Sequence, residues 1–152
     1  EPSLSASNFY LNILNYLQDM TQSLEYISKV SLKHVNNNHK KLKFSQIKEL
    51  KDLDAQLEKL FVSTQSAFLS HSFEEIGEIL HEKELIFDIV KNKISKQVER
   101  TRNEESSPKN TTLYFGLLLE TKDLLTATMN LLEEYYSSHD STIEPATTAS
   151  KK

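Results

Sequence analysis

The sequence predicts an all-α protein, an antiparallel bundle of about four long helices. Apolar residues recur at alternating spacings of three and four, the pattern of helices that each bury one face. Only 2 glycines and 3 prolines occur among 152 residues, so few positions would interrupt a helix. Hydrophobic residues make up 38% and charged residues 26%, which suits one globular domain with its own core.

Composition excludes several classes of function. The net charge of -4 does not indicate a nucleic-acid-binding protein. The absence of cysteine excludes disulfides, thiol catalysis and thiolate metal sites. No apolar run approaches about 18 residues, and no signal peptide is visible. Because the chain starts with Glu1 and not Met, we expect a fragment of a longer protein that carries any targeting signal elsewhere.

The first predicted helix runs from about Asn8 to about Asn36. Its apolar positions follow spacings of 3, 4, 3, 4 and 3 and fall at Tyr10, Ile13, Leu17, Met20, Leu24 and Ile27. An asparagine-rich run at 36–39 then favours a turn.

The second and third predicted helices run from about Phe44 to about Leu69 and from Ser72 to about Arg102. Ser72 with Glu75 three residues later predicts a capping box at the start of the third helix. The apolar stripe of the third helix is interrupted by one charged residue, Lys83.

The fourth predicted helix runs from about Thr111 to about Tyr136, after a restart signalled by Ser107-Pro108. Short connections between helices of similar length predict antiparallel neighbours. We therefore expect one bundle domain at 1–138. The Ser/Thr-rich segment 139–152 is interpreted as a disordered tail.

Two pairs of carboxylates are candidate metal ligands. Glu84 and Asp88 lie four apart on one face of the third predicted helix, and Glu120 and Asp123 share a stripe of the fourth. If the pairs face each other, four carboxylates would bind a divalent or ferric ion through oxygen. The alternative is that both pairs are solvated helix edges, and the sequence leaves the two interpretations open.

One pole of the predicted bundle is basic although the protein is acidic overall. Alternating helix directions bring the first connection and the end of the third helix together, and with them Lys40, Lys41, Lys43, Arg100 and Arg102. Phosphate, another anion or an acidic partner could dock there. Alternatively, these charges only complement helix dipoles in solvent.

No motif in the chain indicates catalysis. There is no glycine-rich phosphate loop and no Gly-x-Ser-x-Gly nucleophile elbow. Glu78 and His81 have the Glu-x-x-His spacing of di-iron bundles, but the sequence has no second copy. We expect no enzyme activity.

A family resemblance adds a functional expectation. The third predicted helix, with Ile76, Leu80, Glu84 and Asp88, resembles the middle helix of a PhoU-like three-helix unit. The segments 110–115, 119–125 and 129–132 are similar to the last helix of the PhoU-like domain that ends bacterial sodium/phosphate cotransporters. The segment from Leu17 to Lys40 is similar to the start of that domain, so that the resemblance covers about residues 8–136.

The resemblance implies a PhoU-like bundle, a three-helix unit preceded by a leading helix. Glu84 and Asp88 match the metal-binding motif of the family's middle helix, whereas the acid in the last helix stands at Asp123 and not four residues after Glu120. It further implies a regulatory domain on the cytoplasmic side of the plasma membrane, docked on the transporter's own transmembrane domain. The alternatives are a free-standing helical adaptor, a metal-binding regulator of phosphate uptake and a metal-dependent enzyme. A homo-oligomer is left open.

Overall fold

The computed structural model describes residues 4–36 and 41–138, which form five helices. They are α1 (Leu4–Asn36), α2 (Phe44–Leu69), α3 (Phe73–His81), α4 (Lys83–Arg102) and α5 (Pro108–Ser138). No strand occurs in these two ranges, so the predicted all-α class is confirmed. The segment interpreted as a tail, 139–152, lies outside the described residues.

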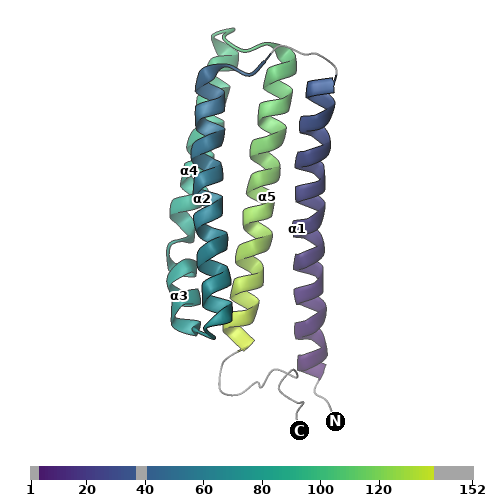
Figure 1. The fold of residues 1–152 in the computed structure, drawn as a ribbon, viewed down its shortest axis with the longest axis vertical. Coiled ribbons are helices and arrows are strands. Elements are labelled where there is room, and N and C mark those ends of the chain that lie inside the picture. The colour runs from purple at the N-terminus through teal and green to yellow at the C-terminus, as the bar shows by residue number, and fades with distance from the viewer. Residues whose placement is uncertain (1–3, 37–40, 139–152) are drawn as a thin grey trace.

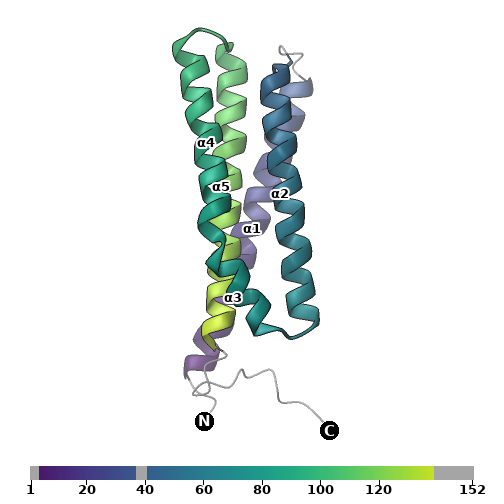
Figure 2. The ribbon, with the colours of Figure 1, turned by 90° about the vertical axis from the view of Figure 1, so that its left-hand side faces the viewer.

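Helices α1, α2, the consecutive pair α3 and α4, and α5 alternate in direction along one long axis (Figures 1 and 2). Helix α5 is the central element, because α1 packs along it and α3 and α4 also contact it. Helix α1 is antiparallel to α5, since Asn12 near its start donates a hydrogen bond to Glu134 near the end of α5, at 3.1 Å. The structure is thus the predicted antiparallel bundle, with α1 on one side of α5 and α2 to α4 on the other.

Two apolar clusters form the core between α2, α3, α4 and α5. The first lies beside the middle of α2 and consists of Leu53, Val90, Tyr114, Leu118 and Leu125. The second lies where α2, α3 and α5 meet and consists of Ala67, Ile76, Met129 and Leu132. Each of these side chains comes from the apolar face of its helix, as the sequence spacing predicts.

The third predicted helix is divided into α3 and α4 at Glu82, which the sequence did not indicate. Glu82 has φ -92° and ψ 1°, outside the α-helical region, although its N–H still bonds to carbonyls of α3. Lys83 follows at the start of α4, and its ammonium lies 2.5 Å from the Glu133 carboxylate of α5. This hydrogen bond raises the pKa of Lys83 and gives the charged residue in the apolar stripe a partner.

The helix ends follow the sequence signals in most places. Helix α2 has the predicted bounds, whereas α1 begins at Leu4 and not at about Asn8. Ser72 accepts a hydrogen bond from the Glu75 N–H at 3.2 Å, but its own N–H donates to the Ala67 carbonyl at 2.9 Å. The capping box is therefore only half formed.

Pro108 is the first residue of α5, where its missing N–H costs nothing. Ser107 caps this helix by accepting from the Asn110 N–H at 3.2 Å. Within the described ranges, none of the helices combines the length and the apolar character needed to cross a bilayer.

Candidate functional site

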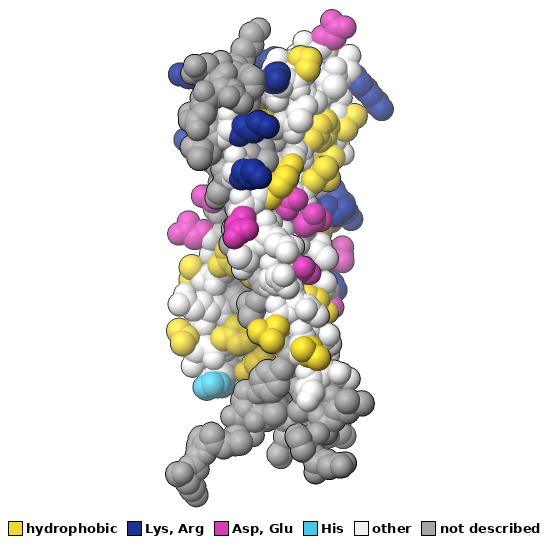
Figure 3. All heavy atoms as spheres, turned by 90° about the vertical axis from the view of Figure 1, so that its right-hand side faces the viewer, with side chains coloured by type: hydrophobic (Ala, Val, Ile, Leu, Met, Phe, Trp, Pro, Cys, Tyr) yellow, Lys and Arg dark blue, Asp and Glu magenta, His cyan; other side chains and the backbone are white. Residues whose placement is uncertain are grey.

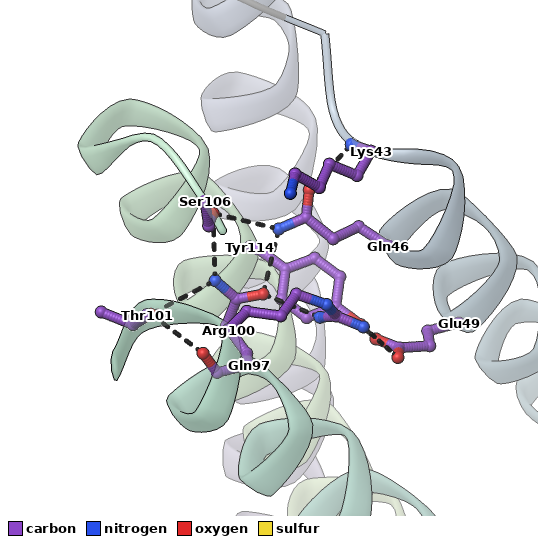
Figure 4. A network of polar contacts seen from close by, with 8 residues as sticks. All are labelled: Lys43, Gln46, Glu49, Gln97, Arg100, Thr101, Ser106 and Tyr114. Atoms are coloured by element: carbon purple, nitrogen blue, oxygen red, sulfur yellow. Dashed lines mark hydrogen bonds and ion pairs between the residues drawn. The ribbon is translucent and has the colours of Figure 1, made fainter. Parts of the chain in front are cut away.

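A network of polar side chains lies inside the bundle where α2 begins, α4 ends and α5 begins (Figure 4). Gln46 donates to Gln97 at 3.0 Å, and both residues are fully buried. Gln97 in turn donates to Ser106 at 3.2 Å, in the connection to α5. The Lys43 N–H donates to the side-chain oxygen Oε1 of Gln46 at 2.9 Å, so the network also holds the start of α2.

An ion pair adjoins this network inside the same pole. The Arg100 guanidinium pairs with the Glu49 carboxylate, which also accepts the Tyr114 hydroxyl. Arg100 also donates to Gln97 at 2.8 Å and lies 5.6 Å from the centroid of the Tyr114 ring. Burial, and next the hydrogen bond to Glu49, raise the pKa of the Tyr114 hydroxyl. The charges are therefore mutually neutralised in the core.

The basic pole expected from the sequence is only partly present. Arg100 is 8% exposed and bound to Glu49, so it is not free to bind an anion. The physical reason is that Arg100 continues the buried stripe of α4, three residues after the buried Gln97. Arg102 is exposed at the end of α4, and Lys40 lies outside the described residues.

Lys41 and Lys43 are exposed and line a groove of about 920 Å³ at this pole. The groove also contains two carboxylates, Glu104 and Glu105, which offset the positive charge. Asn110 lies in the groove wall and is 4% exposed, and its amide nitrogen donates to the Lys41 carbonyl at 2.8 Å. The surface left at the pole is of mixed charge, not uniformly basic.

The two carboxylate pairs are placed against different neighbours. Glu84 and Asp88 are exposed on α4. Glu120 and Asp123 line a groove of about 470 Å³ between α5 and α1, together with Asp19 of α1. Figure 3 shows this side of the molecule, with Asp and Glu side chains at mid-height and Lys and Arg side chains above them.

The predicted four-carboxylate cluster is consequently not formed. Among the side chains that the structure describes, no three His, Asp or Glu gather closely enough to hold a metal ion. The reason is the direction in which the stripe of Glu120 and Asp123 faces around α5. Gly116 and Ala127 share the stripe of Glu120 and Asp123, and small residues admit a close neighbour, which is α1 and not α4.

An apolar groove of about 750 Å³ separates α1 from α2. Its floor is formed by Leu53 of α2 and by Leu117 and Leu124 of α5, all 9% exposed or less. Helix α1 packs mainly on α5 and makes little contact with α2, which leaves the groove open between them. A further groove, between α2 and α4, carries the opposite charges Lys59 and Glu82.

Sequence reasoning missed the buried polar network and the apolar groove. The signal for the network was present, because Gln46 precedes Leu50 by four and Gln97 follows Ile94 by three. Both glutamines therefore occupy positions of the apolar stripe, where a polar residue indicates a buried hydrogen-bonded partner. The groove had no such signal, since spacing does not say how closely two helices approach.

Comparisons with protein-family models, with curated proteins and with solved structures find no match for this chain.

Proposed function

We propose that this chain is a PhoU-like regulatory domain of a bacterial sodium-dependent phosphate transporter. It faces the cytoplasm and acts by docking on the transporter's transmembrane domain, not by catalysis. The proposal combines the sequence resemblance over about residues 8–136 with the arrangement of the helices.

The observation that carries the proposal is the division of the bundle into a three-helix unit and a leading helix. Helices α2, α3, α4 and α5 pack on one another, with α3 and α4 forming one broken rod. Helix α1 adds to this unit from outside, along α5. This is the arrangement that the resemblance implies for a PhoU-like unit that follows a membrane domain.

The surface supports docking as the mode of action. The polar groups of the buried network bind one another, which suits a role in holding three helix ends together. Open grooves and exposed apolar side chains, such as Val62 at 59% and Leu119 at 51% exposure, lie along the sides of the bundle. Exposed apolar surface of this kind favours contact with another protein.

The test is sodium-driven phosphate uptake by the gene product that carries this chain. It is reconstituted in liposomes, and uptake is compared under an inward sodium gradient and an equal potassium gradient. We expect uptake only with sodium. We also expect Leu118→Asp, which disrupts a fully buried core position, to change the rate or its dependence on internal phosphate without abolishing transport. Absence of sodium-dependent uptake would contradict the transporter assignment.

The same experiment separates the alternatives. A free-standing adaptor predicts a gene product without transport activity that instead alters uptake by a separate transporter. A metal-binding regulator predicts that chelator-treated protein regains its effect on adding manganese or iron. The separation of Glu84 and Asp88 from Glu120 and Asp123 does not favour this second alternative.

A further inference from the structure

We propose that the apolar groove between α1 and α2 binds an amphipathic helix with an apolar face and Lys or Arg residues along its edge. This rests on the proposed function in one respect, namely that the helix belongs to a cytoplasmic segment of the transporter's membrane domain. The groove and its chemistry are observations on this chain alone.

The groove has an apolar floor, and aliphatic and aromatic side chains of α2 line one wall. Leu53 and Leu124 at its base are each 2% exposed, and half-buried Leu57 and Phe61 form the α2 wall. Among the described lining residues the one hydroxyl belongs to Thr121, which donates to the Leu117 carbonyl at 2.7 Å within α5. The base therefore requires no hydrogen bond from an occupant and favours aliphatic side chains.

The charged residues among the described lining of the groove are both acidic. Asp54 and Glu58 are exposed, lie one helical turn apart on α2 and border the apolar wall. The ion pairs among described residues are Lys83–Glu133 and Glu49–Arg100, so neither rim carboxylate has a cationic partner there. An occupant with basic residues beside its apolar face would neutralise this rim.

The shape of the groove favours a helix. Its α2 wall extends from Leu50 to Gln65, which corresponds to about 22 Å at 1.5 Å per residue. A helix of about four turns matches that length and would enter between α1 and α2 as an additional bundle member. An anionic lipid fits less well, because its headgroup would meet the carboxylates of the rim.

The transporter supplies a partner of this chemistry. Cytoplasmic loops of membrane proteins carry an excess of Lys and Arg close to the membrane-spanning helices. A cytoplasmic domain with an acidic-rimmed apolar groove is complementary to such a segment. The groove also differs from the pole of the bundle near Lys41 and Lys43, where charges of both signs are mixed.

The test uses the absence of cysteine from the chain. Val62→Cys introduces a single thiol at a position that lines the groove and is 59% exposed, and it is labelled with an environment-sensitive fluorophore. Ser66→Cys, exposed on α2 but outside the groove lining, is the matched control. Each labelled chain is titrated with an amphipathic model peptide of about 16 residues, with leucines on one face and lysines at the edges, or with the same peptide carrying glutamates there.

We expect the lysine peptide to bind at least tenfold more tightly than the glutamate peptide and to change the fluorescence at Val62→Cys only. Asp54→Lys combined with Glu58→Lys should reverse this preference, whereas Asp52→Lys, exposed on α2 outside the groove lining, should leave affinity within twofold. Unchanged melting of each variant would establish that the fold is intact. Equal affinity for both peptides, or no effect of the double reversal, would overturn the proposal.

Two other occupants are tested with the same protein. If the label at Val62→Cys responds instead to rising concentration of unlabelled chain, or to vesicles of anionic lipid, the occupant is a second copy or a membrane, and the proposal is wrong. Failure of the peptide test with intact sodium-driven uptake refutes the groove's role alone. Success of the peptide test without transport leaves a docking groove in a protein of another function.

Discussion

At the scale of single residues, the chain buries an ion pair and two glutamines together in its core. Glu49, Arg100 and Tyr114 form one buried group, and Gln46 and Gln97 continue it. A buried ion pair of this kind contributes little net stability compared with an apolar pair, but removing one partner leaves a charge without compensation. Its effect is to fix how the ends of α2, α4 and α5 meet.

Replacement of Arg100 alone should be strongly destabilising. Arg100→Met leaves the Glu49 carboxylate buried beside apolar groups, and we expect the free energy of unfolding to fall by about 3–5 kcal/mol. The double variant Glu49→Gln with Arg100→Met should recover most of that loss, because glutamine can still accept the Tyr114 hydroxyl. Urea unfolding of the wild type, Glu49→Gln, Arg100→Met and the double variant measures the coupling energy between the two residues. If the double variant is as unstable as Arg100→Met, the loss comes from packing and not from the unpaired charge.

The raised pKa of Tyr114 predicts a loss of stability in alkali. Below about pH 10 the phenol is neutral in the folded and the unfolded chain, so its stability contribution is constant. Above that value the unfolded chain loses the proton first, and the free energy of unfolding should fall by up to about 1.4 kcal/mol per pH unit. Tyr114→Phe should remove this part of the slope at pH values above about 10 in urea unfolding. Equal slopes for the two proteins would contradict burial of the phenol.

At the scale of helices, the sequence predicted well which segments are helical and where most of them begin and end, because apolar spacing and end signals act locally. Helix α2 has its predicted bounds, and Ser107-Pro108 marks the start of α5. The interruption at Glu82 was not predictable in the same way, since no glycine or proline marks it. The candidate site was predicted less well. Spacing identified the stripe of Glu120 and Asp123 but could not say that α1, not α4, covers it.

Two leucines that both lie on the apolar stripe of their helix should differ in their contributions to stability. Leu124 of α5 is 2% exposed, so Leu124→Ala should lower the free energy of unfolding by about 2–5 kcal/mol. Leu57 of α2 is half-buried in the wall of the apolar groove, and Leu57→Ala should cost less, about 1–2 kcal/mol, because it leaves no enclosed cavity. Denaturant unfolding compares them. Equal large losses would mean that the groove is closed in solution.

At the scale of the whole molecule, one helix of the bundle is attached through a single main neighbour. Helix α1 packs chiefly on α5. A Cβ added to Gly116 of α5 would lie 3.8 Å from the Tyr26 hydroxyl oxygen of α1. Helices α2, α4 and α5 contribute to both described core clusters, and α3 contributes to the second. An element held by one neighbour can detach while the rest of the bundle stays packed, and a local opening of this kind requires less free energy than global unfolding. The groove lined by Asp19, Glu120 and Asp123 and the apolar groove both lie along α1, so the position of α1 governs both surfaces.

This arrangement predicts that the three-helix unit folds without α1. A chain reduced to residues 41–138 should remain helical and unfold cooperatively, because both core clusters stay intact. Its denaturation midpoint should be lower than that of the full chain, since the α5 surface that α1 covers becomes exposed.

In the full chain, amide hydrogen exchange should be faster in α1 than in α4 and α5. Circular dichroism and exchange measurements test both expectations. A reduced chain that shows no cooperative transition, or uniform protection across all the helices, would mean that α1 belongs to the minimal folding unit. The bundle would then be a single four-rod structure, and the interpretation of α1 as a leading helix would be wrong.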